Sequence, residues 1–369
     1  MINILLTAAG SPVFIPAFKS LRANPNLKDL KIHTCDMNTE ALGLKIADAF
    51  FYVPPGNSTE YIPAVYSYCK ENQIDLIIPA ADEELSQLSQ NKEMFLNIGC
   101  KILVSSSHTL KTIQNKASLY NACRRSLSLP EIIPEFRVCN DLSSFKHHYD
   151  KIRSLGHKVC VKPAFAHGSR GFRVIEDLPS KADFFNKKSN SRSITYDFFC
   201  SILAQDKDPI PDLLVMEYLP GEEFSVDCLA KDGKFYCVTR RRDTIVDGIC
   251  SVGTVIKKLD LIEKAQNLYE RLDLQYNANI QFRYDAGGNP KLLEINPRVA
   301  GTMELCRGAG VDFVGLAVNQ ALDFEEISNI SVEWGTTMNR VWQEIFHAEN
   351  NIFTLESIAS VVSSKNNLK

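Results

Sequence analysis

The chain has 369 residues, of which 45% are hydrophobic and 23% are charged, and its formal net charge is −3. This length exceeds a single ordinary core and favours two or three domains or subdomains. The near balance of charge gives no support to non-specific binding of nucleic acid or of an anionic membrane. We therefore expect a globular protein with neither nucleic acid nor membrane as a partner.

The chain has eleven cysteines but no C-x-x-C pair, and their neighbours are often apolar, as at Cys160 and Cys237. This pattern favours free, buried thiols in a reducing compartment, with a zinc site or a disulfide framework as the alternative. The start of the chain, Met1 to Leu6, indicates a strand and not a signal peptide. No apolar run approaches the ~20 residues of a membrane span. We expect a cytoplasmic protein.

The first hundred residues alternate short apolar runs with amphipathic segments. Continuous apolar strands separated by helices are typical of a doubly wound parallel sheet. We predict such a domain over residues 1–105, with a helix at Tyr61 to Glu71 and with strands at Ile2 to Thr7, Lys31 to Asp36, Asp75 to Pro79 and Lys101 to Val104.

Two polar segments lie at the ends of these strands. The loop Thr7 to Ser11 opens a helix as a phosphate-binding turn does, but it lacks the G-x-G-x-x-G spacing of a dinucleotide site. Asp82, Glu83 and Glu84 follow a strand at the edge where open α/β sheets bind ligands. They are equally compatible with acids that complement a helix dipole, so both interpretations stay open.

After Ser105 to Ser107 the pattern changes to α+β with antiparallel signals. Residues 179–211 are rich in Ser, Asn, Lys and Asp and are predicted to form a surface insertion, helical around Ile194 to Leu203. Residues 331–369 have the weakest pattern and are predicted to be a C-terminal extension with a frayed end.

The segment V-C-V-K-P-A-F-A-H-G-S-R-G combines an apolar strand that carries Lys162 with a polar, glycine-containing loop. A lysine among hydrophobic residues is costly unless an anion meets it, and such a loop can turn backbone N–H groups toward phosphate oxygens. The alternative is an ordinary β-hairpin turn with a lysine whose charged end reaches solvent.

A second segment, L-L-V-M-E-Y-L-P-G-E-E-F-S-V-D, is a strand, a Pro-Gly turn and a second strand. The first strand ends in a hydrophobic stretch whose free backbone groups could hold an adenine edge, and a carboxylate just beyond it could hold ribose hydroxyls. In the second strand Glu223, Ser225 and Asp227 share one face. An ordinary hairpin with a solvated acidic face remains the alternative.

The third segment joins strands at Asn277 to Tyr284 and Lys291 to Asn296 through a loop that contains Gly287-Gly288, a strong two-residue turn signal. This register places Gln281 opposite Glu294 and Asn279 opposite Asn296 on one face. One carboxylate with several amide oxygens suits Mg²⁺ that also takes phosphate oxygens. A polar, solvated sheet face is the alternative.

These segments occur in order and at suitable spacing, together with N-K-A-S-L-Y, N-I-Q-F and L-E-I-N-P-R-V-A-G. With them the chain resembles the ATP-grasp superfamily, and above all the ATP-binding half-domains of carbamoyl phosphate synthetase large subunits. The resemblance implies a pre-ATP-grasp domain over residues 1–105 and a two-lobed ATP-grasp domain over 106–330. Its lid lobe would cover about 130–211, its C-terminal lobe about 212–330, and the extension 331–369.

The resemblance also implies roles for single residues. Lys116 and Lys162 would contact ATP phosphates, and Gly168, Ser169, Arg170 and Gly171 would lie over the triphosphate on a mobile lid. Glu217, Tyr218 and Leu219 would form the adenine hinge, with Glu223 at the ribose. Gln281, Glu294 and Asn296 would hold Mg²⁺, with Mn²⁺ as an alternative, and Arg298 would face the γ-phosphate. Arg240 and Arg242 match more loosely, as residues that meet a carboxylate substrate.

The implied activity is an ATP-dependent ligation of a small carboxylate to an amine through an acyl phosphate. The chain has a single ATP-grasp unit, so carbamoyl phosphate synthesis, which uses two, is disfavoured. Carboxylation or phosphorylation of a small molecule is the alternative chemistry, and a non-catalytic ATP-binding regulator is the alternative class. The sequence identifies neither substrate, and a homodimer is an assembly that it leaves open.

Overall fold

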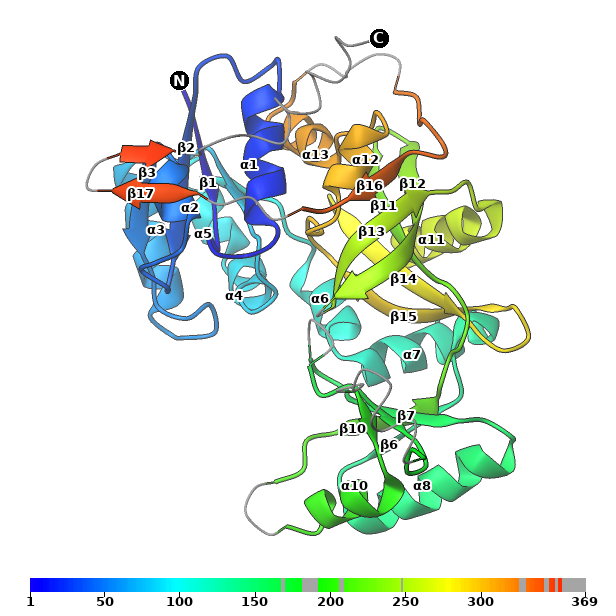
Figure 1. The fold of residues 1–369 in the computed structure, drawn as a ribbon. Helices are drawn as coiled ribbons and strands as arrows, with labels where there is room; N and C mark the ends of the chain where they lie inside the picture. Colours follow the sequence, from blue (N-terminus) through cyan, green and yellow to red (C-terminus); the bar gives the residue numbers. More distant parts are fainter. Residues whose placement is uncertain are drawn as a thin grey trace.

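The computed structural model describes residues 1–166, 170–180, 192–205, 209–246, 248–324, 330–341, 345–348 and 351–353. Figure 1 shows a blue and cyan N-terminal domain beside a yellow-green lobe, with a green lobe below the yellow-green one. The predicted fold class is confirmed, because a parallel sheet is followed by a domain with two further sheets.

The N-terminal domain is a five-stranded parallel sheet with the order β3-β2-β1-β4-β5. Ile4 in the central strand pairs with Ile32 and Leu76, and all three are buried, as both faces of a parallel sheet require. Four strands lie at the predicted positions, whereas the short edge strand β3 was not anticipated. The elements are β1 (Ile2–Leu6), β2 (Leu30–Asp36), β3 (Ala49–Tyr52), β4 (Leu76–Ile78), β5 (Lys101–Ile102), α1 (Phe14–Ala23), α2 (Gly43–Ile46), α3 (Tyr61–Glu71), α4 (Leu85–Gln90) and α5 (Lys92–Leu96).

Two capped helices lead into the second domain. α6 (Ser107–Ile113) follows Ser106, whose hydroxyl accepts the Thr109 N–H at 3.2 Å. α7 (Lys116–Arg125) follows Asn115, whose side-chain oxygen accepts the Ser118 N–H at 3.1 Å. Such caps satisfy N–H groups that the first helical turn leaves free. The second cap thereby fixes Lys116 at the start of α7.

The lid lobe is a five-stranded sheet with the order β6-β10-β7-β8-β9. Its central strands are antiparallel, and Leu214 lies between Val138 and Lys162. The lobe extends past the predicted limit at residue 211, because β10 returns to this sheet. Its elements are η1 (Pro130–Ile132), β6 (Phe136–Cys139), α8 (Leu142–Ser154), β7 (Val159–Pro163), β8 (Arg173–Ile175), β9 (Ser193–Ile194), α10 (Tyr196–Leu203) and β10 (Leu213–Glu217).

The C-terminal lobe is built on a six-stranded antiparallel sheet with the order β15-β14-β11-β12-β13-β16. β16 comes from the predicted C-terminal extension, so this sheet continues past residue 330. Two later strands, β17 (Phe346–Ala348) and β18 (Asn351–Phe353), pair only with each other in the described chain. The elements of the lobe are β11 (Glu223–Lys231), β12 (Lys234–Val246), β13 (Ile249–Val255), α11 (Leu259–Arg271), β14 (Ala278–Tyr284), β15 (Pro290–Asn296), α12 (Glu304–Gly308), α13 (Phe313–Ala321) and β16 (Thr337–Asn339).

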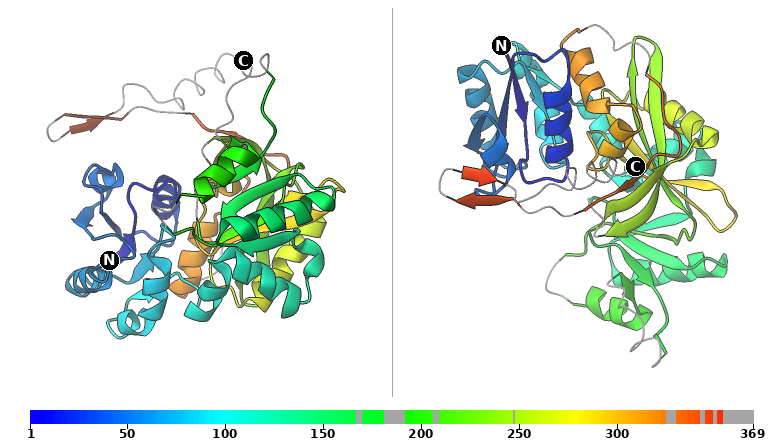
Figure 2. Two further views of the ribbon diagram at one scale, coloured as in Figure 1. Left: turned by 90° about the horizontal axis from the view of Figure 1, so that it is seen from below. Right: turned by 45° about the horizontal axis from the view of Figure 1, so that its top comes forward.

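The N-terminal domain packs against the helices of the C-terminal lobe, as the two views of Figure 2 also show. The Ser20 hydroxyl on α1 donates to Asp312 at 2.6 Å, and the Asn24 amide donates to Asn319 at 3.0 Å. Polar bonds between buried or partly buried groups fix the relative position of the two bodies more narrowly than apolar contacts alone.

All eleven cysteines are free thiols and nine of them are buried, in agreement with the predicted cysteine usage. Burial raises the pKa of the Cys160 thiol to about 12 and that of Cys139 to about 12, so these thiols stay protonated. Among the described helices, none combines the length and the apolarity needed to cross a membrane.

The interior of the C-terminal sheet contains an ion pair between Arg240 and Asp227, which are 1% and 0% exposed. Asp227 also accepts hydrogen bonds from the Asn279 amide at 2.6 Å and the Cys306 thiol at 3.3 Å. Burial alone would lower the pKa of Arg240, but Asp227 outweighs burial and raises it. The pair is therefore a structural centre of this sheet.

We predict that Asp227→Ala lowers the free energy of unfolding by about 3–5 kcal/mol, because it leaves a buried guanidinium without its anion. Urea denaturation followed by circular dichroism measures this loss. The control is Glu222→Gln, which removes an exposed carboxylate partner of the neighbouring Arg241 and is expected to change stability little. Equal losses in the two variants would refute the assigned role of the buried pair.

Candidate active site

The site is organised by the pairing of β14 with β15. Gln281 lies opposite Glu294 and Asn279 lies opposite Asn296, as predicted. The predicted two-residue turn is wrong, because Tyr284 pairs with Pro290 and a wider loop closes the hairpin. A bulge between the pairs Phe282–Leu292 and Gln281–Glu294 then shifts the register by one residue and restores the predicted pairing of Gln281 with Glu294. The polar residues consequently share one face although the turn differs.

The bulge has a second consequence at Leu293, the residue that it leaves without a cross-strand partner. The Leu293 carbonyl accepts the Tyr120 hydroxyl at 2.8 Å and the Lys162 ammonium at 3.3 Å, and Lys162 also donates to the Tyr120 oxygen at 3.0 Å. Because a buried carbonyl needs a donor, the bulge ties α7 and the lid strand β7 to the C-terminal lobe.

Two lysines lie beside the carboxylate of Glu294. The Lys116 ammonium is 3.4 Å from a Glu294 oxygen and donates to the Ala166 carbonyl at 2.5 Å. Burial alone would raise the pKa of Glu294, but Lys116 and Lys162 outweigh it and hold that pKa below its usual value. Burial lowers the pKa of both lysines, and Glu294 opposes this shift. Two cations therefore face a single anion, which suits an anionic ligand.

A cavity of about 130 Å³ extends from these charges toward the strand β10. At its far end the Glu217 carbonyl accepts the Cys160 thiol at 3.5 Å, and the Tyr218 N–H donates to the Lys158 carbonyl at 2.7 Å. The carboxylate of Glu217 points elsewhere, accepting the Glu135 N–H at 2.9 Å. The Glu217 carboxylate is therefore turned to another partner, while Tyr218 and Leu219 line this end of the cavity.

Glu223 lines the same cavity between two guanidinium groups. Arg242 donates to one of its oxygens, and Arg283 lies 3.5 Å from the other. Arg242 also lies 3.4 Å from the amide oxygen of Gln281. Arg283 was not predicted; its position follows from the pairing of β11 with β14, which sets it opposite Glu223.

A second, larger cavity of about 830 Å³ lies between the N-terminal domain and the C-terminal lobe. We call it the interdomain cleft. Its N-terminal wall includes the loop after β1 and the acidic residues after β4, and its other wall includes Ser225, Asn296 and Arg298. Five described residues line both cavities: Arg170, Arg242, Gly248, Gln281 and Glu294.

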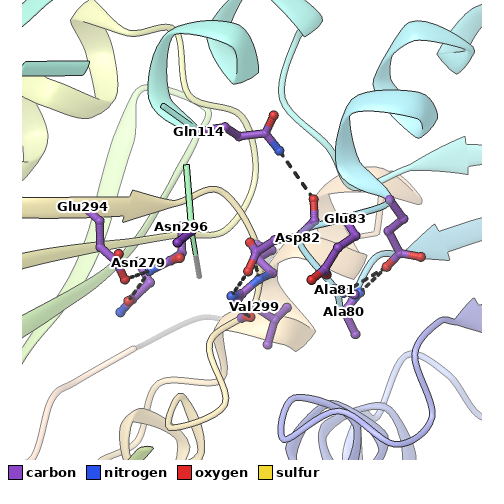
Figure 3. Close-up of polar contacts among 12 residues, drawn as sticks. Ala80, Ala81, Asp82, Glu83, Gln114, Asn279, Glu294, Asn296 and Val299 are labelled. Atoms are coloured by element: carbon purple, nitrogen blue, oxygen red, sulfur yellow. Dashed lines mark hydrogen bonds and ion pairs between the residues drawn. The ribbon is translucent and has the colours of Figure 1, made fainter. Parts of the chain in front are cut away.

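Asp82, which Figure 3 shows beside Val299, is bonded to Arg298 and so connects the two walls of the cleft. The Arg298 Nε and Nη2 atoms donate to the two Asp82 oxygens at 2.8 and 2.6 Å, and its third nitrogen donates to the Val299 carbonyl at 3.1 Å. Burial alone would lower the pKa of Arg298, but Asp82 outweighs it and raises it. Asp82 thus faces the cleft, which favours the ligand-side interpretation of this residue over that of an acid that complements a helix dipole.

Glu84, in contrast, belongs to the interior of the N-terminal domain. It accepts the Thr7 hydroxyl at 2.6 Å and the N–H groups of Ala80 and Ala81 at 3.0 Å, and it also bonds to the Tyr61 hydroxyl. Burial raises its pKa. Its main role here is to join the ends of β1 and β4.

The remaining predicted residues differ in their positions. Arg240 is a correction: it is buried against Asp227 and lines neither cavity in the described chain, whereas Arg242 lines both. Arg170 is largely exposed and lies 3.7 Å from Glu83. Gly171 has a φ of +73°, and a Cβ there would lie 2.7 Å from the Pro163 ring, so this turn requires glycine. Gly168 and Ser169 lie outside the described residues.

Comparisons with known proteins agree with this geometry. A family model described as "ATP-grasp in the biosynthetic pathway with Ter operon" matches residues 209–343, and one described as "PylC-like, N-terminal domain" matches residues 4–103. The chain therefore carries a PylC-like N-terminal domain followed by an ATP-grasp domain. The predicted resemblance to the ATP-grasp superfamily is confirmed.

Among curated proteins, the carbamoyl phosphate synthase large chain of Clostridium acetobutylicum is 23% identical over 232 residues, which are 60% of this chain and 20% of that protein. The biotin carboxylase of Campylobacter jejuni in complex with βγ-ATP has a TM-score of 0.66 at 17% identity, covering 91% of this chain and 74% of that one. An L-amino acid ligase from Bacillus licheniformis has a TM-score of 0.62 at 14% identity, covering 87% and 74%. The chain spans about a fifth of the length of the carbamoyl phosphate synthase large chain, so the substrates of this protein are proposed separately below.

We predict that Asp82→Asn destabilises the contact between the N-terminal domain and the ATP-grasp domain, because Arg298 then keeps a largely buried charge without a carboxylate. Losing one partner of such a pair costs about 2–5 kcal/mol. Thermal unfolding and limited proteolysis measure the change. Glu83→Gln is the matched control, since Glu83 is an exposed neighbour. A variant as stable and as protease-resistant as this control would contradict the prediction.

Proposed function

We propose that the protein is an ATP- and Mg²⁺-dependent ligase that joins a small carboxylate to an amine through an acyl phosphate. One observation carries this proposal: the lysine-lined cavity and the interdomain cleft meet at Glu294, Gln281 and Arg242. A group that must pass from a nucleotide to a second substrate needs such a junction, where the two ligands come into line.

In this proposal the nucleoside part of ATP enters the smaller cavity, and its phosphates extend toward the junction with the interdomain cleft. The backbone at Glu217 to Leu219 holds the adenine edge, and Glu223 holds the ribose hydroxyls. Lys116 and Lys162 neutralise phosphate oxygens, which accounts for two lysines beside one carboxylate. Neutralising the phosphoryl oxygens is the main means by which proteins speed phosphoryl transfer.

The polar face of β14 and β15 fits Mg²⁺ that is shared with phosphates. Glu294 supplies a carboxylate, and Gln281 and Asn296 supply amide oxygens beside it. In the described chain no three His, Cys, Asp or Glu side chains gather as a metal site, so the remaining ligands must come from the nucleotide and water, as is usual for this ion. When bound, the ion supplies positive charge at the phosphoryl group.

The reaction then has two steps. A carboxylate oxygen of the first substrate attacks the γ-phosphorus, and ADP leaves. An amine nitrogen next attacks the carbonyl carbon of the acyl phosphate, phosphate leaves, and the nitrogen loses a proton to give an amide. Arg242 and Arg298 line the cleft where these groups would lie, and water must be kept out to protect the acyl phosphate.

The size of the cleft indicates that at least one organic substrate lies in it. A cavity of about 830 Å³ is in the range that holds organic ligands of considerable size. Bicarbonate alone would leave most of it empty. The L-amino acid ligase among the structural neighbours supports a ligation between organic substrates.

The test is a phosphate-release screen of carboxylic acids against amines, with product masses. We expect a pair that gives ADP, phosphate and an amide in equal amounts. With a carboxylate labelled with ¹⁸O, one label must appear in the released phosphate, because that oxygen bridges carbon and phosphorus in the acyl phosphate. An active pair that releases unlabelled phosphate, or a product made from bicarbonate without an amine, would refute the proposal.

We further predict that Glu294→Gln lowers kcat by at least about a hundredfold, since it removes the only carboxylate from the proposed metal ligands. The fold should persist, because the side chains are nearly equal in size. Steady-state kinetics and circular dichroism test the two statements. The exposed Glu263→Gln on α11 is the control, and kcat of Glu294→Gln within a few-fold of this control would remove Glu294 from the site.

A further inference from the structure

The N-terminal wall of the interdomain cleft is formed where the parallel strands of that domain end. Leu6 of β1 pairs with Thr34 of β2 on one side and with Ile78 of β4 on the other. The segments that follow these three strands, and the segment that follows β3, all line the cleft. Because neighbouring strands lie ~4.8 Å apart, the end of β2 is about 10 Å from the end of β4 along this wall.

The end of β4 is the part of this wall that lies by the proposed reaction centre. Asp82, which follows β4, is bonded to Arg298 and acts electrostatically on both Glu294 and Lys116. The junction of the two cavities is therefore close to the end of β4. A substrate that reaches from there to the ends of β2 and β3 must extend about 10 Å or more along the wall.

The far end of the wall is apolar. Met37 follows β2, and Val53, Pro54 and Pro55 follow β3, and all four residues line the cleft. The Val53 N–H donates to the Asp36 carbonyl at 3.3 Å, so the two segments are adjacent. We call these four residues the apolar patch. Met37 is 64% exposed, and adjoining apolar residues that face a cavity are typical of a ligand-binding groove.

The charged side chains of this wall are all acidic. The N-terminal domain, every residue of which is described, contributes Asp36, Asp82, Glu83 and Glu84 to the cleft but no lysine, arginine or histidine. Asp36, the acid beside the apolar patch, is bonded within its own loop, since its two oxygens accept the N–H groups of Gly10 and Asn38 at 2.7 and 2.8 Å. A carboxylate or a phosphate at the apolar patch would therefore meet no positive charge from this domain.

We propose that the amine substrate lies along the N-terminal wall and carries an apolar group about 10 Å from its reacting nitrogen, with Met37 as a specificity-determining residue for that group. The acidic wall attracts an ammonium ion and repels a carboxylate, whereas the arginines that line the cleft come from the ATP-grasp domain in the described chain. Burial of a hydrocarbon group against the apolar patch supplies the affinity.

The role of this amine as a substrate rests on the proposed function, whereas its binding at the apolar patch does not, and the two are tested separately. The first test is titration calorimetry of the purified protein with ethylammonium, butylammonium and hexylammonium chloride. The variants are Met37→Asn and Met37→Leu, the second of which keeps an apolar side chain. Leu96→Asn is the control, because Leu96 is exposed in the same domain and is not one of the described residues that line the two cavities.

We expect the association constant to rise by about twofold to fourfold for each added methylene group, as its partial or full burial implies. Met37→Asn should lose most of the gain from ethylammonium to hexylammonium, whereas Met37→Leu and Leu96→Asn should keep it. Circular dichroism shows whether each variant is folded. A wild type that is indifferent to chain length, or a gain that survives in Met37→Asn, overturns the proposal.

The second test uses the substrate pair from the phosphate-release screen, with the amine varied in chain length and in its far end. The value of kcat/KM should rise with chain length, and a carboxylate or phosphate at the far end should remove that gain. Met37→Asn should raise the KM for the long-chain amine and leave the KM for ATP and for the short amine unchanged.

Two results of this second test would contradict the assignment. A preference for the amine with the charged far end overturns the apolar assignment, and a dependence on the chain length of the acid in place of the amine overturns the choice of substrate. If the screen yields no amide at all, the proposed function fails while the calorimetric result stands.

Discussion

The site depends on the charges of Glu294, Lys116 and Lys162. Lys116 lies 3.4 Å from Glu294, and Lys162 donates to the carbonyl of the neighbouring Leu293. The three charges come from β15, from the first position of α7 and from the lid strand β7. Each charge alone would have a high desolvation cost in its partly buried position. Together the three charges reduce this cost, but their sum is still positive. In the proposed function a triphosphate meets the excess positive charge. The bonds of Lys162 to Leu293 and Tyr120 also tie the lid lobe to the C-terminal sheet.

The hairpin of β14 and β15 shows how far a sequence can specify such a site. Alternation of polar and apolar residues places Gln281 and Glu294 on one face, and this much could be predicted. The loop could not, because Asp285 holds it through side-chain bonds to the N–H groups of Gly287 and Asn289, both at 2.8 Å. The wider loop shifts the register, and the bulge at Leu293 shifts it back. The need to keep Glu294 on the polar face therefore outweighed the local turn preference.

The sequence could not predict how far along a strand a residue lies from the cavity, or which distant segments come into contact. Arg240 and Arg242 lie two residues apart on the same face, yet one is sealed against Asp227 and the other reaches both cavities. Periodicity gives the face of a strand and not the position of the cavity along it. The pair of Asp82 and Arg298 joins residues 216 positions apart, and no local pattern encodes that contact. The three motifs of the ATP-grasp domain were recognisable because each is confined to a short stretch of chain.

The segment after β15 explains why the N-terminal domain belongs to the site. Arg298 is held by Asp82 of that domain, and Gly301 lies so close to its Pro12 that an added Cβ would be 3.2 Å from the Pro12 side chain. The carbonyl of the same Gly301 holds Arg340. Arg298 on the ATP-grasp wall of the cleft thus takes its position from a segment that is itself positioned by the N-terminal domain. Because packed segments shift as units and not atom by atom, the fit between the domains sets the geometry of the cleft. In the proposed function the N-terminal domain is therefore half of the substrate site, because it supplies one wall of the interdomain cleft.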